Sequence, residues 1–153
     1  MGSTTVRDYA FEDMICNIGP AGAGIVDISG WDTDGGLEFE FPEDMVSHEA
    51  GAAGEVFLSK NSDQRVTVNI TVRQGTQACT YLGGLLIAQD RARGDIPKHT
   101  FFMKSFSTGE IVKSDKAIFT QRPTPNQQAE SSERVFQMLL PDAAGRILYG
   151  TSL

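Results

Sequence analysis

The chain has 153 residues, and its 40% of hydrophobic residues suffice for one compact domain with a buried core, which argues against an array of modules. Its formal net charge of −7 disfavours a protein that binds DNA by attraction to the phosphates. The charge is uneven, since residues 1–55 carry twelve acids and one base, or −11, and residues 56–153 carry +4; folding either averages this out or brings unlike parts of neighbouring copies together.

The first part of the chain alternates apolar and polar residues, which is typical of half-buried strands. We predict strands at residues 9–18, 25–29 and 37–41, with glycine-rich turns between them. In the third strand Glu38 and Glu40 are two positions apart, so both carboxylates lie on one face and the apolar residues lie on the other. This pattern predicts a solvated acidic face above an apolar one.

A connection at residues 44–54 follows, and its two glycines permit a tight reversal of the chain. Its polar and glycine residues include Asp44, His48, Glu49, Gly51 and Gly54. We predict a long hairpin connection here. Strands at residues 55–60 and 65–73 come next, and the second alternates β-branched and polar residues across nine positions.

Residues 78–91 depart from this alternation, because their apolar residues fall on one helical face. Thr76 is a suitable N-cap and Gly94 a suitable stop, so we predict one helix. Gly83 and Gly84 lie inside it, which indicates either a close approach of the helix backbone to a sheet or local fraying.

The last part of the chain again reads as strands. We predict them at residues 100–106, 111–119, 134–140 and 146–149. A polar run at residues 126–132 interrupts them. The elements together predict a mainly β, α+β fold of antiparallel strands with one helix.

Catalytic and metal-binding patterns are weak in this sequence. His48 and His99 have no metal-ligand spacing, and we expect each to be solvated or hydrogen-bonded. Glu38 and Glu40 are separated by roughly 6.5 to 7 Å along a strand, which an inverting glycosidase could use. The sequence lacks the aromatic cleft that such enzymes place around the pair, so the solvated face is the better interpretation. We expect no enzyme activity, metal or cofactor.

Cys16 and Cys79 lie far apart in the sequence and form no Cys-x-x-Cys motif, so we expect two buried, reduced thiols. The N-terminal residues lack the apolar core of a signal peptide, and no apolar run approaches the length of about 20 residues that crosses a bilayer. We therefore expect folding in a reducing cytosol, without a membrane step.

The order of these features resembles that of the tail tube proteins of contractile-tailed bacteriophages. The features that carry the resemblance are the opening Tyr9-x-Phe11-Glu12-Asp13, the acidic strand 37–41, residues 45–47 leading to 51–56, Asn61-Ser62-Asp63 before strand 66–72, the helix with Leu82, Leu85 and Leu86, and the strands near 100–106 and 135–140. The pattern covers nearly the whole chain. The part after residue 120 departs most, with a Pro-x-Pro corner and the polar run.

This resemblance implies a single tail-tube domain over residues 1–153, built as a β-sandwich or barrel of antiparallel strands with one flanking α-helix. It implies a structural protein of the virion tail, assembled in the host cytoplasm, whose hexameric rings stack into a hollow tube through which phage DNA enters the host. Glu38 and Glu40 would then line the lumen without binding DNA specifically. The hairpin loop 44–54, with Asp44, His48, Glu49, Gly51 and Gly54, would reach the neighbouring ring.

The same resemblance names the expected partners, which are further copies of the chain, a tail sheath protein, and tape-measure and baseplate proteins, with no membrane. One alternative is the related tube of a type VI secretion system, which shares the fold. Another is a monomeric β-sandwich binding module, for instance for carbohydrate. Such a module predicts clustered exposed aromatic residues, whereas Trp31 is the only tryptophan in the chain.

Overall fold

The computed structural model of the chain describes residues 14–20, 26–27, 36–106, 108–125, 127 and 133–150. Several expectations lie outside these ranges. They are the motif from Tyr9 to Asp13, Trp31, the start of the first predicted strand, the ends of the second, and all of the polar run 126–132 except Gln127.

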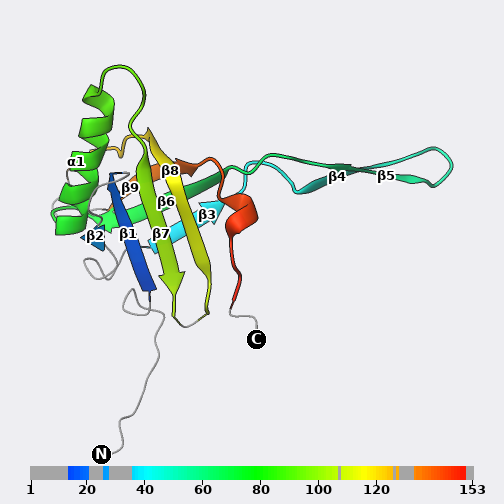
Figure 1. Cartoon of the computed structure of the whole chain (residues 1–153), viewed down its shortest axis with the longest axis horizontal. Coiled ribbons are helices and arrows are strands. Elements are labelled where there is room, and N and C mark those ends of the chain that lie inside the picture. The colour runs from blue at the N-terminus through cyan, green and yellow to red at the C-terminus, as the bar shows by residue number, and fades with distance from the viewer. Residues whose placement is uncertain are drawn as a thin grey trace, which may run out of the picture.

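Within the described residues the fold is mainly antiparallel β with a single α-helix, which confirms the predicted class (Figure 1). The elements are β1 (Met14–Pro20), β2 (Val26–Asp27), β3 (Gly36–Glu40), β4 (Val46–Ala50), β5 (Val56–Lys60), β6 (Val66–Arg73), α1 (Gln77–Arg91), β7 (His99–Ser105), β8 (Ile111–Gln121), β9 (Glu133–Leu140) and a 3₁₀ turn, η2 (Ala144–Arg146).

Two expected boundaries were wrong. The hairpin connection predicted at residues 44–54 contains a strand, β4, which pairs with β5. The strand predicted at 146–149 is instead the end of η2 followed by a single bridge between Leu148 and Ile111. The backbone here is held by the turn itself, where the Arg146 N–H donates to the Ala143 carbonyl, and it makes no continuous ladder.

Seven strands pair in the order β2-β1-β7-β8-β9-β6-β3, and β8 belongs to both halves of this sheet. Its first part, Ile111 to Ala117, pairs with β7, and its last part, Ile118 to Gln121, pairs with β9. Register shifts accompany the change of partner. The sheet therefore folds into two layers, which we name the β1–β7 layer and the β6–β9 layer.

The core lies between these layers. Strand β6 buries Val66, Val68, Ile70 and Val72 at every second position, as its alternation predicts. Strand β9 buries Phe136, Met138 and Leu140 in the same way. Phe39 of β3 meets Phe101 of β7 edge to face with ring centroids 6.1 Å apart, so the two layers face each other. Each fully buried side chain of this size contributes roughly 1.5 to 3 kcal/mol.

Helix α1 covers one open side of the sandwich (Figure 1). It begins at its predicted cap, where the Thr76 hydroxyl accepts a hydrogen bond from the Cys79 N–H at 3.2 Å. It buries Ala78, Leu82 and Leu85 in the common core, and the Tyr81 hydroxyl donates to the Ile18 carbonyl of β1 at 2.8 Å. The helix is thereby fixed to the edge of the β1–β7 layer.

The expectation that the helix backbone approaches a sheet closely at Gly83 and Gly84 was wrong. A Cβ atom added at either glycine would meet nothing within 4 Å among the described residues, so no neighbouring strand demands a glycine there. The helix is nevertheless continuous through both positions.

Candidate functional site

The solvent-facing side of the β6–β9 layer carries the two predicted carboxylates. Glu38 and Glu40 of β3 are both exposed, whereas Leu37 and Phe39 turn towards the core. Glu38 lies in one cross-strand row with Asn69 of β6, and Asn69 in turn faces Gln137 of β9. The alternation thus places Glu38 and Glu40 on one face, as predicted. We call this side the polar face.

Side-chain hydrogen bonds hold the middle of the polar face. The Gln137 amide donates to the Asn69 amide oxygen at 3.3 Å, and the Thr120 hydroxyl of β8 donates to the Gln137 amide oxygen at 2.9 Å. Arg73 and Glu133 face each other across β6 and β9 at one end. The described residues of this face thus present amides and hydroxyls between three carboxylates (Glu38, Glu40 and Glu133) and two guanidiniums (Arg73 and Arg122), which leaves a small negative balance.

The second predicted site, the hairpin loop, lies in the long connection between β3 and β6. Figure 1 shows β4 and β5 projecting far from the sandwich as a narrow two-stranded arm. Asp44, His48 and Glu49 are all exposed on it. The turn closes with the Gly51 N–H donating to the Glu55 carbonyl at 2.6 Å, and Gly54 takes a φ of 84°, which favours glycine.

Sequence reasoning missed the apolar character of this arm. All ten residues of β4 and β5 are exposed. Three consecutive residues of β5 are exposed apolar side chains: Val56 at 65%, Phe57 at 58% and Leu58 at 73%. Because neighbouring residues of a strand point to opposite faces, this run puts apolar groups on both faces of the arm. The unbroken apolar run was the available signal, since it indicates a strand covered on both sides.

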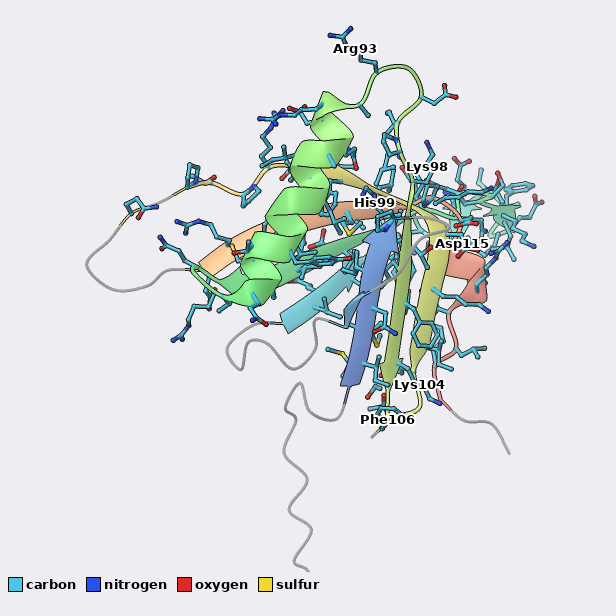
Figure 2. The ribbon with its side chains drawn as sticks, turned by 60° about the vertical axis from the view of Figure 1, so that its left-hand side comes forward. Arg93, Lys98, His99, Lys104, Phe106 and Asp115 are labelled. Atoms are coloured by element: carbon cyan, nitrogen blue, oxygen red, sulfur yellow. The ribbon has the colours of Figure 1, made fainter. Side chains whose placement is uncertain are left out.

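The outer side of the β1–β7 layer has the opposite charge. Lys104 of β7 and Lys113 and Lys116 of β8 lie on its exposed or half-exposed positions, with Asp115 beside them. The Lys104 ammonium lies 5.4 Å from the centre of the Phe106 ring, and Figure 2 shows both residues at the same end of β7. The two outer sides of the sandwich therefore differ in charge.

His99, at the other end of β7, is buried (Figure 2). Its Nδ1 lies 3.2 Å from the Ala117 carbonyl oxygen, which can only accept, so Nδ1 carries the proton. Its ring packs edge to face on Phe119. Burial lowers the pKa of His99, although the hydrogen bond to Ala117 opposes this shift. The residue serves the packing of β7 on β8. His48 is solvent-exposed on the arm.

Reactive and metal-ligating side chains are sparse among the described residues. Cys16 is buried and Cys79 only partly so. No group of three histidine, cysteine, aspartate or glutamate residues within the described ranges is arranged to hold a metal ion. In that same part of the chain, no helix combines the length and the apolar character that crossing a membrane requires.

Comparison with known proteins agrees with this architecture. Residues 6–143 match the family described as Bacteriophage PhiTE tail tube protein. A solved structure described as the cryo-EM structure of the anti-feeding prophage cap, the AFP tube terminating cap, superposes with a TM-score of 0.52 at 12% sequence identity, covering 98% of this chain and 95% of that one. At this identity the likeness concerns the fold. No curated protein matches the sequence.

Proposed function

We propose, from the premise that the chain belongs to the family of the bacteriophage PhiTE tail tube protein, that it forms hexameric rings which stack into a hollow tube for phage DNA. Membership makes the chain a structural protein of the phage tail, located in the virion, and this family is not an enzyme class. The ring, the stacking and the passage of DNA are the proposed steps. The observation that carries them is the exposed apolar arm.

The arm supports stacking because an isolated two-stranded hairpin is at best marginally stable in water. Val56, Phe57 and Leu58 gain burial only against another surface, and the arm extends beyond the reach of its own sandwich. In a stack of rings, the surface that buries these side chains would belong to a subunit of the next ring. The predicted residues Asp44, His48, Glu49, Gly51 and Gly54 then lie at that contact.

The polar face supports a role as the wall of the channel. Six copies of a chain at −7 carry −42 per ring, and Glu38 and Glu40 would add carboxylates directly to the bore. DNA phosphates within about 8 Å, the Debye length at physiological salt, are repelled by such a wall. The amide ladder beside these carboxylates is uncharged, and the two guanidiniums nearby are balanced by carboxylates, since Arg73 faces Glu133 and Arg122 pairs with Asp90.

The remaining partners are those that membership of a tail tube family implies. With the polar face inward, the lysine-bearing side of the β1–β7 layer would face outward towards a tail sheath protein of a contractile tail. Tape-measure and baseplate proteins would meet the tube during assembly in the host cytoplasm. We prefer a phage tail over a secretion tube because the matched family is a phage tail tube family. The arm with its exposed apolar residues argues against a monomeric binding module.

Assembly is tested by light scattering and negative-stain imaging of the purified chain and of a variant in which Phe57→Ser and Leu58→Ser remove apolar groups from the arm. We expect the wild-type chain to form hollow rods. The variant should remain as single rings or monomers with an unchanged unfolding temperature, because neither residue belongs to the core. A wild-type chain that stays monomeric at high concentration contradicts the proposal.

The lumen is tested separately in phage particles that carry Glu40→Lys. We expect normal tubes and delayed DNA ejection at low salt, with the delay reduced at higher salt because screening weakens the phosphate contact. Asp115→Lys is the matched control, since it makes the same charge change on exposed β8 in the other layer. Equal ejection rates in the two variants would remove Glu40 from the channel wall.

A further inference from the structure

Two side chains on one broad face of α1 attach the helix to different parts of the sheet. In its first half, the Tyr81 hydroxyl donates to the Ile18 carbonyl of β1 at 2.8 Å. Near its end, the Gln89 amide donates to the Phe119 carbonyl of β8 at 2.9 Å and accepts from the Phe119 N–H at 2.8 Å. Phe119 lies where β8 pairs with β9, so α1 joins the β1–β7 layer to the β6–β9 layer.

The Gln89 contact replaces one that β7 cannot make. His99 of β7 pairs with Ala117, and the same register would bring Pro97 opposite Phe119. Proline has no N–H and cannot donate to the Phe119 carbonyl. The Gln89 amide supplies both the donor and the acceptor that a neighbouring strand would supply, and it thereby holds the end of α1 against β8.

Gly83 and Gly84 lie between the two attachments, and packing does not account for them. A Cβ atom at either position would meet nothing within 4 Å among the atoms that the structure describes. Glycine has a low helix propensity, and it is one of the residues at which helices bend. The helix is therefore weakest between Tyr81 and Gln89.

Space for a movement lies beside the second attachment. A cavity of about 170 Å³ separates part of the end of α1 from β8, and Leu86, Gln89 and Phe119 are in its wall. The same wall contains Asp90 and Arg122, whose side chains lie 2.7 Å apart and are 56% and 69% exposed. An ion pair this exposed adds little stability. The two hydrogen bonds of Gln89 are therefore the main polar contact that keeps this end of the helix closed.

We infer that residues 85–91 form a hinged flap, which bends at the two glycines and is held to β8 by Gln89. The first half of α1 stays in place, because Ala78 and Leu82 have no exposed surface. In the flap, Leu85 is the one buried residue. Opening of the flap would release one attachment between the layers and let their mutual angle change while the sheet stays paired.

Amide hydrogen exchange of the full-length chain tests the flap. We expect residues 86–91 and the Phe119 amide to exchange together, at least about tenfold faster than residues 80–83, because local opening exposes only the first group. Equal exchange in the two halves of the helix would mean that α1 opens as one unit, and it would overturn the inference.

Gly83→Ala combined with Gly84→Ala tests the hinge. Both substitutions make bending less favourable, so we expect exchange of residues 86–91 to slow by about twentyfold. Thr80→Ala is the matched control, since it also raises helix propensity but is an exposed change in the half that stays closed. The same slowing in both variants would show that the glycines are not a hinge.

Gln89→Glu tests the contact that closes the flap. A carboxylate can accept from the Phe119 N–H but cannot donate to its carbonyl, whereas the protonated acid can do both. Compared with the wild type at the same pH, we expect Phe119 to exchange about tenfold faster at about pH 7 and nearly equally at about pH 4. Asp90 and Arg122 are present in both proteins, so their own titration cancels in this ratio.

Gln77→Glu is the matched control for this substitution, because it makes the same change at the exposed first residue of α1. We expect it to leave the exchange of Phe119 unchanged at both pH values. A ratio for Gln89→Glu that equals that of this control, or that does not depend on pH, would overturn the role of Gln89.

Discussion

The sandwich and the arm are both built from antiparallel strands, yet they differ in what covers their apolar residues. Strand β6 buries every second side chain in the core that lies between the two layers and is covered by α1. Strands β4 and β5 expose every residue, including Val56, Phe57 and Leu58. The first region is stabilised by its own chain, whereas in the proposed tube the second would be covered by another copy.

This difference separates folding from assembly. Core residues should control the free energy of unfolding of each subunit, whereas arm residues should control only the association of subunits. Substitutions in the core and in the arm can therefore test whether the arm contributes to the free energy of unfolding of the subunit or only to association.

The largest expected effect is in the core. Phe136 is buried between the layers and packs edge to face on Phe119, so Phe136→Ala should lower the free energy of unfolding by about 3 to 5 kcal/mol. Phe57→Ala is the matched substitution on the arm and should leave the denaturant midpoint of the monomer nearly unchanged. A similar midpoint shift for both variants, measured by circular dichroism, would mean that the arm is part of the folding core.

A smaller effect is expected at the tip of the arm. Gly54 has a φ of 84°, and a side chain in this left-handed conformation costs about 1 to 2 kcal/mol. Gly54→Ala should therefore open the turn and speed amide exchange in β4 and β5, without lowering the melting temperature of the sandwich.

Gly83→Ala is the contrasting glycine variant. It lies in α1 with open space around its Cβ position and should stabilise the sandwich by about 1 kcal/mol. If Gly54→Ala also lowers the melting temperature of the sandwich, the two regions unfold together.

The sequence predicted the sandwich better than the arm for a physical reason. The alternation of β6 is a direct consequence of its buried face, so it was visible in residues 65–73. Strand β4 buries nothing in its own chain, and its residues Val46 to Ala50 show no such alternation. Its extended conformation comes from pairing with β5, which a one-dimensional pattern does not display.

The candidate site likewise has one part that the sequence predicts and one part that only the structure shows. The shared face of Glu38 and Glu40 follows from the period of a strand, and the sequence was sufficient to predict it. The contact of Gln89 with Phe119 joins residues thirty positions apart and exists because β8 changes partner between the layers. No local pattern marks such a glutamine, so this contact emerged only from the folded chain.

Lowering the pH should destabilise the sandwich because the buried His99 resists protonation in the folded state. Burial holds its pKa below the ordinary value of 6.5, so the unfolded chain binds the proton more readily and stability falls as the pH drops below about 6.5. Asp63, whose pKa is lowered by its hydrogen bonds with Arg65, acts in a separate window, because its contribution is lost only as the pH falls below about 3.8.

His99→Gln keeps an N–H for the Ala117 carbonyl and removes the titration. Urea unfolding between about pH 7 and 5 should therefore show a smaller loss of stability in the variant than in the wild type. Parallel curves for the two proteins would contradict the assignment of this window to His99.

The smallest effect that still distinguishes the regions is at the start of α1. The Thr76 hydroxyl accepts from the Cys79 N–H, and Thr76→Ala should lower the free energy of unfolding by about 1 kcal/mol because one N–H loses its partner. The cap follows the end of β6 and lies outside the arm, so rod formation at temperatures below the melting temperature should be unaffected. Thr76→Ser, which retains the hydroxyl, should recover most of the loss. If Ser and Ala are equally destabilising, the methyl group of Thr76 and not its hydrogen bond stabilises the helix.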